Sequence, residues 1–180
     1  MTNLLSVESI DDILPIYRQT PIGLLLEYHN LNRVYDVFDN AKLLVGMCMD
    51  NRKHLHMPDN FAYIIRSGGA NLRYSGFKVS YAIAVGHVSH IALIGHNNCG
   101  MVNLIARKSE FINGLVDVAG WKRDDAEAHF MQYAPMFEIG KETDFILSET
   151  KRLRVLYPNV LIAPMFYLVD DNKLYFVKEE

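Results

Sequence analysis

Apolar residues in this chain fall into short continuous runs separated by amphipathic stretches. Residues 41–48, 61–65 and 90–95 form runs with the length of buried strands. Residues 75–85 have helical character between the second and third of these runs, and Gly86 ends that helix. Strands that alternate with helices in this way are typical of a parallel sheet covered on both faces.

The first forty residues form an apolar arm ahead of this pattern. Residues 6–17 carry apolar side chains at helical spacing, and residues 22–31 are apolar with few charges, so two helices are expected within residues 1–40. A large apolar surface on a soluble protein is normally covered. The arm therefore lies either on its own sheet or across a second copy of the protein.

The second half of the chain predicts more helices and a terminal hairpin. Three helices are expected, at residues 99–108, 121–133 and 140–156. Asn97 or Asn98 serves as the N-cap of the first, and Pro135 ends the segment that holds the second. Two strands close the chain on either side of a polar turn at residues 170–172, and they span residues 160–169 and 174–177.

These elements predict one α/β domain over residues 1–180, with a helical arm in residues 1–40 and an α/β core in residues 41–180. The expected sheet is central and mostly parallel, helices flank it, and the C-terminal strands lie at its edge. In open sheets of this kind, functional sites form outside the carboxyl ends of the strands. Cys48 and His96 both fall at such ends.

Composition narrows the class of protein. The chain has 180 residues, of which 50% are hydrophobic and 22% charged, and its net charge is −3; these values are ordinary for a globular domain. No basic patch suggests nucleic-acid binding, no apolar run reaches the ~20 residues of a membrane span, and the N-terminus lacks a signal-peptide pattern. A cytoplasmic protein is expected, in which both cysteines stay reduced.

Those two cysteines, Cys48 and Cys99, are candidate metal ligands together with His96. Zinc binds thiolates and imidazole well, and three protein ligands leave a fourth position open, as in catalytic sites. If Cys99 opens a helix, the helix N-terminus also favours its thiolate. A lone cysteine at a strand end is more often a small buried apolar residue. The second cysteine in a matching position favours the metal interpretation.

Asp50 and Arg52 follow Cys48 at alternate positions. In an extended chain the three side chains point the same way, so Asp50 is expected beside the metal and Arg52 is expected to pair with it through a bidentate hydrogen bond. A carboxylate held in this way orients metal-bound water instead of occupying the open position. The alternative interpretation is an ordinary surface ion pair.

The sequences CMDNR at residues 48–52 and HNNCG at residues 96–100 resemble the zinc signature of the β-class carbonic anhydrases. The sequence IIRSGG at residues 64–69 is similar to that family's strand and Arg-Asn-Ala-Gly turn. Ser67 replaces the asparagine of that turn, and His87 stands where many members have glycine. The paired cysteine and histidine motifs carry most of the resemblance.

The resemblance implies that Cys48, His96 and Cys99 bind Zn²⁺ and that Asp50 and Arg52 form the catalytic dyad beside it. It implies reversible hydration of carbon dioxide to bicarbonate by a zinc-bound hydroxide, and assembly into a homodimer or a higher homo-oligomer. Two thiolates already offset the zinc charge. The hydrogen bond from water to Asp50 therefore gains importance.

Other interpretations use the same residues. The family includes hydrolases of carbonyl sulfide and carbon disulfide, and a non-catalytic relative would carry a structural zinc with Asp50 as its fourth ligand. His54 and His56 are either proton shuttles or solvated loop residues. Arg66 is either a structural ion-pair residue or part of the pocket. Residues 109–139 do not align with the family by sequence.

Overall fold

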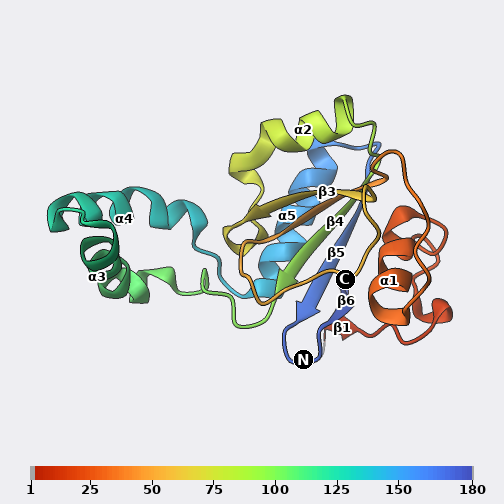
Figure 1. The fold of residues 1–180 in the computed structure, drawn as a ribbon, viewed down its shortest axis with the longest axis horizontal. Helices are drawn as coiled ribbons and strands as arrows, with labels where there is room; N and C mark the ends of the chain where they lie inside the picture. The colour runs from red at the N-terminus through yellow and green to blue at the C-terminus, as the bar shows by residue number, and fades with distance from the viewer. Residues whose placement is uncertain (1–2, 180) are drawn as a thin grey trace.

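A computed structural model describes residues 3–179. They form a six-stranded sheet in the order β1-β6-β5-β4-β2-β3, with helices on both faces (Figure 1). β2, β3, β4 and β5 run parallel, whereas β6 and β1 are antiparallel to their neighbours. The mostly parallel α/β architecture expected from the sequence is confirmed.

Most predicted elements are present with shifts of a few residues. The strands are β1 Leu4–Leu5, β2 Leu43–Cys48, β3 Ala62–Ser67, β4 His90–His96, β5 Leu161–Leu168 and β6 Lys173–Val177. The helices are α1 Pro21–Leu31, α2 Gly76–Ala84, α3 Lys108–Ala119, α4 Arg123–Phe137 and α5 Glu142–Leu156. Four 3-10 turns join them, namely η1 Ile10–Asp12, η2 Gly68–Ala70, η3 Arg73–Ser75 and η4 Leu104–Arg107. The terminal hairpin of β5 and β6 is confirmed at one end of the sheet, where β1 adds the outermost strand.

Alternate side chains of the central strands pack against opposite layers of helix. Val45 and Met47 of β2 belong to a buried cluster that includes Leu25 of α1. Leu44 points to the other face and packs in a cluster with Leu153 of α5 and with α2. Full burial of one such side chain stabilises the fold by about 1.5–3 kcal/mol. The apolar arm was expected either on its own sheet or across a second copy of the protein. The helix α1 packs on its own sheet.

The prediction of a helix at residues 6–17 is wrong. Only the short turn η1 forms there, because the Asp12 carboxylate accepts a hydrogen bond from the backbone N–H of Ser9 at 2.8 Å. Side-chain bonds of this kind compete with the helical ladder, and Pro15 disfavours helical geometry in the residue before it. The second arm helix is confirmed as α1. Residues 1 and 2 of the arm lie outside the described residues.

The prediction of a helix at residues 99–108 is also wrong. Asn98 (φ 54°) and Asn103 (φ 51°) have left-handed backbone conformations, which an α-helix cannot continue through. Asn97 caps no helix, because its Oδ1 accepts the backbone N–H of Val169 at 2.8 Å. Cys99 therefore lies in a loop, and the expected contribution of a helix N-terminus to its thiolate is absent.

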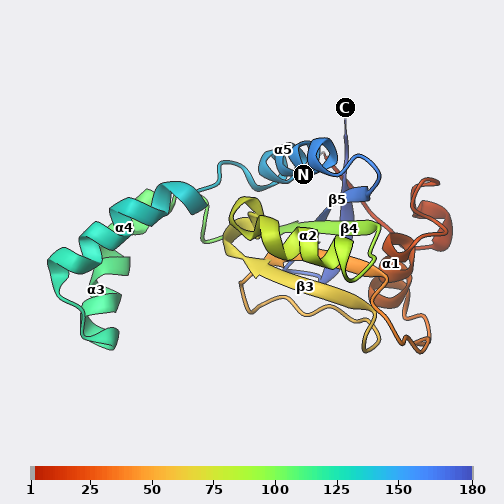
Figure 2. The same cartoon turned by 90° about the horizontal axis from the view of Figure 1, so that it is seen from above.

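α3 and α4 form a helical hairpin that projects away from the sheet (Figures 1 and 2). An ion pair between Lys108 and Glu127 (2.6 Å) joins the two helices. The helix predicted at residues 121–133 is longer than expected, because Pro135 lies exposed in the last turn of α4 and the helix continues to Phe137. Within residues 3–179, no helix has the length and apolar character needed to cross a bilayer.

Strand register brings two of the candidate ligands to one edge of the sheet. Met47 of β2 lies opposite Ile94 of β4 in a parallel pair. Cys48 and His96 are the last residues of these two strands. Both side chains therefore leave the sheet at its carboxyl edge.

Candidate metal centre

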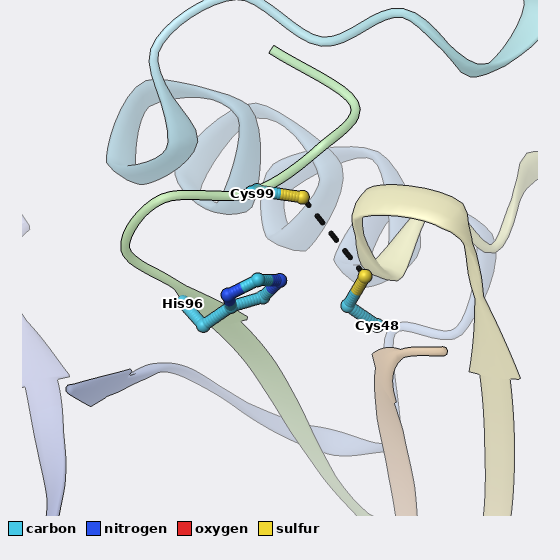
Figure 3. Close-up of side chains that lie close together, drawn as sticks. All are labelled: Cys48, His96 and Cys99. Atoms are coloured by element: carbon cyan, nitrogen blue, oxygen red, sulfur yellow. Dashed lines mark hydrogen bonds between the residues drawn. The ribbon is translucent and has the colours of Figure 1, made fainter. Parts of the chain in front are cut away.

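Cys48, His96 and Cys99 lie together at this edge (Figure 3). One ligand atom from each residue lies within 4.8 Å of the other two. Their relative exposures are 3%, 1% and 6%. Within residues 3–179, this is the one cluster of three or more histidine, cysteine or acidic residues with a spacing that suits a metal ion.

His96 presents an unpaired nitrogen to the two sulfur atoms. Its Nδ1 lies 2.8 Å from the carbonyl oxygen of Asn97 and must donate to it, so the lone pair of the neutral ring is on Nε2. That Nε2 is buried and has no hydrogen-bond partner, which is costly for a polar atom. A metal ion bound at Nε2 removes this cost.

The two sulfur atoms have the spacing of zinc ligands. Cys48 Sγ and Cys99 Sγ are 3.9 Å apart, and two sulfurs at ~2.3 Å from a tetrahedral zinc lie about 3.8 Å apart. A hydrogen bond between the thiols lowers the pKa of Cys48 and raises the pKa of Cys99. A metal ion bound by both sulfurs would displace the thiol protons, because thiolates are the ligands. The donor set and its spacing fit Zn²⁺.

Asp50 and Arg52 form a bidentate pair next to this cluster. Arg52 Nε lies 3.0 Å from Oδ1 of Asp50, and Nη2 lies 2.7 Å from Oδ2. These hydrogen bonds hold the pKa of Asp50 well below its ordinary value. The chain turns at residues 51 and 52 instead of staying extended, and the Arg52 N–H also donates to Asp50 Oδ1 at 2.9 Å. Asp50 stands outside the three-residue cluster.

The cationic side chains of Arg66 and Lys53 donate hydrogen bonds to backbone carbonyl oxygens of the loop after β2. Arg66 donates from Nη1 to the carbonyl oxygen of Cys48 at 3.2 Å, so it holds the loop and has no ion-pair partner within the described residues. Lys53 donates from Nζ to the carbonyl oxygen of Asp50 at 3.1 Å. Burial lowers the pKa of Lys53, and the neighbouring Cys48 and Asp50 oppose this shift. The sequence analysis missed Lys53, since a lysine in a polar loop gives no sign of burial.

The loop that carries Cys99 is held from three sides. Arg52 Nη2 donates to the carbonyl oxygen of Asn98 at 2.9 Å. Asn97 binds the backbone at Val169 through its side chain. The backbone N–H of Cys99 donates to Oε1 of Glu142 at 3.4 Å. No sequence pattern indicates this role for Glu142, which lies 43 positions further along the chain at the start of α5.

The other histidines of interest stand apart from the cluster. His54 and His56 are exposed, and the His56 ring lies against that of His29 at 5.2 Å between centroids. His87 has a left-handed backbone (φ 55°) at the end of α2. His90 begins β4 and His96 ends it, so these two lie at opposite ends of the strand. None of the four joins the candidate ligand group.

An apolar cavity of about 480 Å³ opens beside the centre. Core residues next to the ligands form one wall, and aromatic residues of the hairpin form the other. The lining includes Met49, Gly68, Met101, Phe111, Phe130, Tyr133 and Phe137. The buried ligands thus border a region that favours apolar molecules.

Comparison with known proteins supports the fold through structure rather than sequence. No protein family and no curated protein sequence matches the chain. A carbonic anhydrase from Streptococcus mutans superposes with a TM-score of 0.60 at 17% identity, covering 87% of this chain and 95% of that chain. A β-carbonic anhydrase from Trichomonas vaginalis gives 0.59 at 17% identity, covering 83% and 91%. The chain has the β-carbonic anhydrase fold.

A carbon disulfide hydrolase in its apo form shares this fold as well. Its TM-score is 0.57 at 20% identity, with 78% of this chain and 80% of that chain covered. The β-carbonic anhydrase fold expected from the sequence is thus confirmed. At such identities the chemistry has to be argued from this chain's own residues.

Proposed function

We propose that this protein is a zinc-dependent carbonic anhydrase that catalyses reversible hydration of carbon dioxide to bicarbonate. Cys48, His96 and Cys99 would hold the zinc. The observation that carries the proposal is the buried, unpaired Nε2 of His96 facing two sulfurs 3.9 Å apart, next to a carboxylate held by an arginine. A structural zinc is normally closed by four protein ligands, and a fourth is lacking within the described cluster.

Zinc bound at this centre supplies the Lewis acidity that makes water a nucleophile near neutral pH. Asp50 stays ionised because Arg52 bonds both of its oxygens. An ionised carboxylate accepts a hydrogen bond from water, and it thereby orients the oxygen lone pair toward the substrate carbon. Arg52 thus acts through Asp50. The two thiolates lessen the effective charge of the metal, which increases the need for this orientation.

The apolar cavity supports a small nonpolar substrate. Met49 and Met101 line it, and they lie one and two residues after Cys48 and Cys99, so the cavity lies against the loops that carry both cysteines. Carbon dioxide is apolar and bicarbonate is an anion. A cavity of this kind therefore favours the substrate over the product next to the reacting atoms.

The edge of the sheet supports assembly into a homodimer or a higher homo-oligomer. β3 is the last strand on its side, and its residues Tyr63 and Ile64 are exposed by 40% and 46%. Phe77 and Tyr81 on the adjacent α2 are exposed by 82% and 50%. An open edge strand flanked by apolar side chains is unfavourable in water unless another chain covers it. A second copy of this protein is the occupant we infer.

Hydrolysis of carbonyl sulfide or carbon disulfide is the second candidate function. These molecules are also small, linear and apolar, so the same cavity and the same attacking water suit them. A carbon disulfide hydrolase is among the proteins with this fold. Release of sulfide from either compound, with negligible hydration of carbon dioxide, would establish this alternative.

The test of the proposed function combines zinc analysis with stopped-flow hydration of carbon dioxide. Wild-type protein should bind about one zinc per chain, and C48A should lose both zinc and activity. D50N should keep its zinc and lose about 10- to 100-fold in kcat. D59N removes an exposed carboxylate elsewhere in the loop and is the matched control. Full activity in D50N would refute the role of the dyad.

A further inference from the structure

Lys53 is the one fully buried lysine of residues 3–179, with a relative exposure of 0%. Lysine is rarely buried to this degree unless its charge is paired. Its Nζ donates to the carbonyl oxygen of Asp50 at 3.1 Å and lies 3.6 Å from Oδ1 of the same residue. Both the backbone and the carboxylate of Asp50 therefore face this ammonium group.

The position of Lys53 is fixed, whereas that of Arg52 is adjustable. Arg66 donates from Nη2 to the carbonyl oxygen of Lys53 at 3.3 Å and from Nη1 to that of Cys48 at 3.2 Å, so it holds both ends of the loop. The Lys53 side chain is enclosed by protein. The Arg52 side chain is 43% exposed, and water can solvate it if its partner moves.

This difference matters because a carboxylate near an open zinc position is itself a zinc ligand. If Asp50 moved onto the metal, Arg52 could keep its bond to the carbonyl oxygen of Asn98, and water could solvate the rest of its exposed guanidinium. Lys53 would instead stay buried and lose the carboxylate that is one of its nearby negative partners, Cys48 being another, which is unfavourable. Loss of the ammonium would remove this penalty.

We propose that Lys53 is a positioning residue that keeps the Asp50 carboxylate off the metal. The proposal deepens the proposed function and rests on its zinc centre. A lysine that merely filled space would be replaced without consequence by methionine, which has a similar volume. A lysine that positions Asp50 through charge can be replaced by arginine but not by methionine or glutamine.

The deciding experiment compares crystal structures of zinc-loaded wild type, K53Q and K53M at one neutral pH. Glutamine keeps a donor for the Asp50 carbonyl and removes only the charge, whereas methionine removes both. In the two variants an Asp50 oxygen should lie ~2.0–2.2 Å from zinc, with the Arg52 pair broken. Wild type and K151Q, which changes an exposed lysine on α5, should keep the pair. Asp50 still on Arg52 in K53Q and K53M would overturn the proposal.

A solution measurement gives the same answer without crystals. In Co²⁺-loaded protein with ¹³C-labelled aspartate carboxyls, the Asp50 signal is assigned by its absence in D50N. Contact with the paramagnetic ion should broaden that signal in K53Q and K53M but not in K53R. If K53Q does not fold, K53M alone decides, because the Asp50 carbonyl oxygen that loses Lys53 still accepts from Arg66 Nη1 at 3.4 Å. Unchanged signals in the folded variant contradict the proposal.

Kinetics separate this proposal from the function on which it rests. kcat for carbon dioxide hydration should fall about 10- to 100-fold in K53Q at unchanged zinc content, and K53R should recover most of it. A zinc-loaded wild type without hydration activity refutes the proposed function. Even in that case the location of Asp50 in K53Q can still be measured. The positioning role of Lys53 and the proposed carbonic anhydrase activity can therefore fail independently.

Discussion

Arg52 Nη2 lies 2.9 Å from the carbonyl oxygen of Asn98, so the loop after β2 is bonded to the loop after β4. The same nitrogen lies 2.7 Å from Oδ2 of Asp50. One guanidinium therefore connects the proposed catalytic carboxylate to the loop that carries His96 and Cys99. Arginine is suited to this role because its planar fork offers several donors in fixed directions.

R52K should impair activity without emptying the centre. A single ammonium keeps the charge but cannot bond both Asp50 oxygens and the Asn98 carbonyl at once. We expect kcat/KM for carbon dioxide hydration to fall about 10- to 100-fold, with zinc content near one per chain. R18K, at an arginine of the arm, is the control. Unchanged kinetics in R52K would show that charge alone holds Asp50.

N97A should loosen the loop that carries Cys99. Its Oδ1 accepts the backbone N–H of Val169 at 2.8 Å, and removing the acceptor leaves that N–H unpaired at a cost of about 1–3 kcal/mol. The free energy of unfolding in urea should fall by this amount, and zinc should dissociate faster to a chelator. N97D alone would set a carboxylate against Asp170, whose Oδ2 accepts from Asn97 Nδ2 at 3.2 Å, so it is combined with D170N. This double variant keeps an acceptor for the Val169 N–H and should retain most of the stability. Equal losses in both variants would contradict the assignment.

H29N should flatten the dependence of stability on pH. Burial, together with the nearby His56, lowers the pKa of His29 to about 4, below its ordinary value of about 6.5. As pH falls below ~6.5 the unfolded chain binds the proton first, so the native state loses up to about 3 kcal/mol by pH 4.

The backbone N–H of His56 donates to Nδ1 of His29 at 3.0 Å. An asparagine at position 29 can still accept this hydrogen bond, but it does not titrate. Urea unfolding at several pH values between 4.5 and 7.5 should show a shallower slope in H29N than in wild type. H54N, at an exposed histidine, should keep the wild-type slope. Parallel slopes in H29N and wild type would rule out His29 as the source.

I64K should convert the proposed dimer to a monomer. Ile64 lies on the open edge strand β3 and is 46% exposed, and a lysine there opposes pairing with another chain. Light scattering after gel filtration should give twice the chain mass of 20.6 kDa for wild type and the single mass for I64K. V34K changes a more exposed apolar residue of the arm (86%) and should remain a dimer. A wild-type monomer would refute the inferred assembly.

Continuous apolar runs made the sheet predictable from the sequence. β2, β4 and β5 are buried along most of their length, and their apolar runs leave few alternatives. The arm at residues 6–17 has the spacing of a helix, but the Asp12 side chain and Pro15 interrupt it. Local spacing cannot weigh these competing bonds.

The candidate ligands were accessible from the sequence because each falls at the end of an apolar strand. The contacts that hold these ligands in place could not be predicted from the sequence. Asn97 was expected to cap a helix, and its actual partner, Val169, lies 72 positions away. Lys53 is buried by Arg66 and by the loop itself. Such partners come from tertiary packing, which single-sequence patterns do not encode.

The hairpin of α3 and α4 has a consequence for how sequences of this kind can diverge. Its helices pack mainly against each other and against η4, and not against the sheet. Changes in its length or composition leave the strand register and the ligand edge intact. Substitutions can therefore accumulate here under weak constraint. Residues 109–139, which could not be aligned with the β-class family by sequence, coincide with this hairpin, whose aromatic residues line one wall of the cavity. A segment that packs little against the sheet is thus well placed to change which molecule reaches the metal without disturbing the ligands.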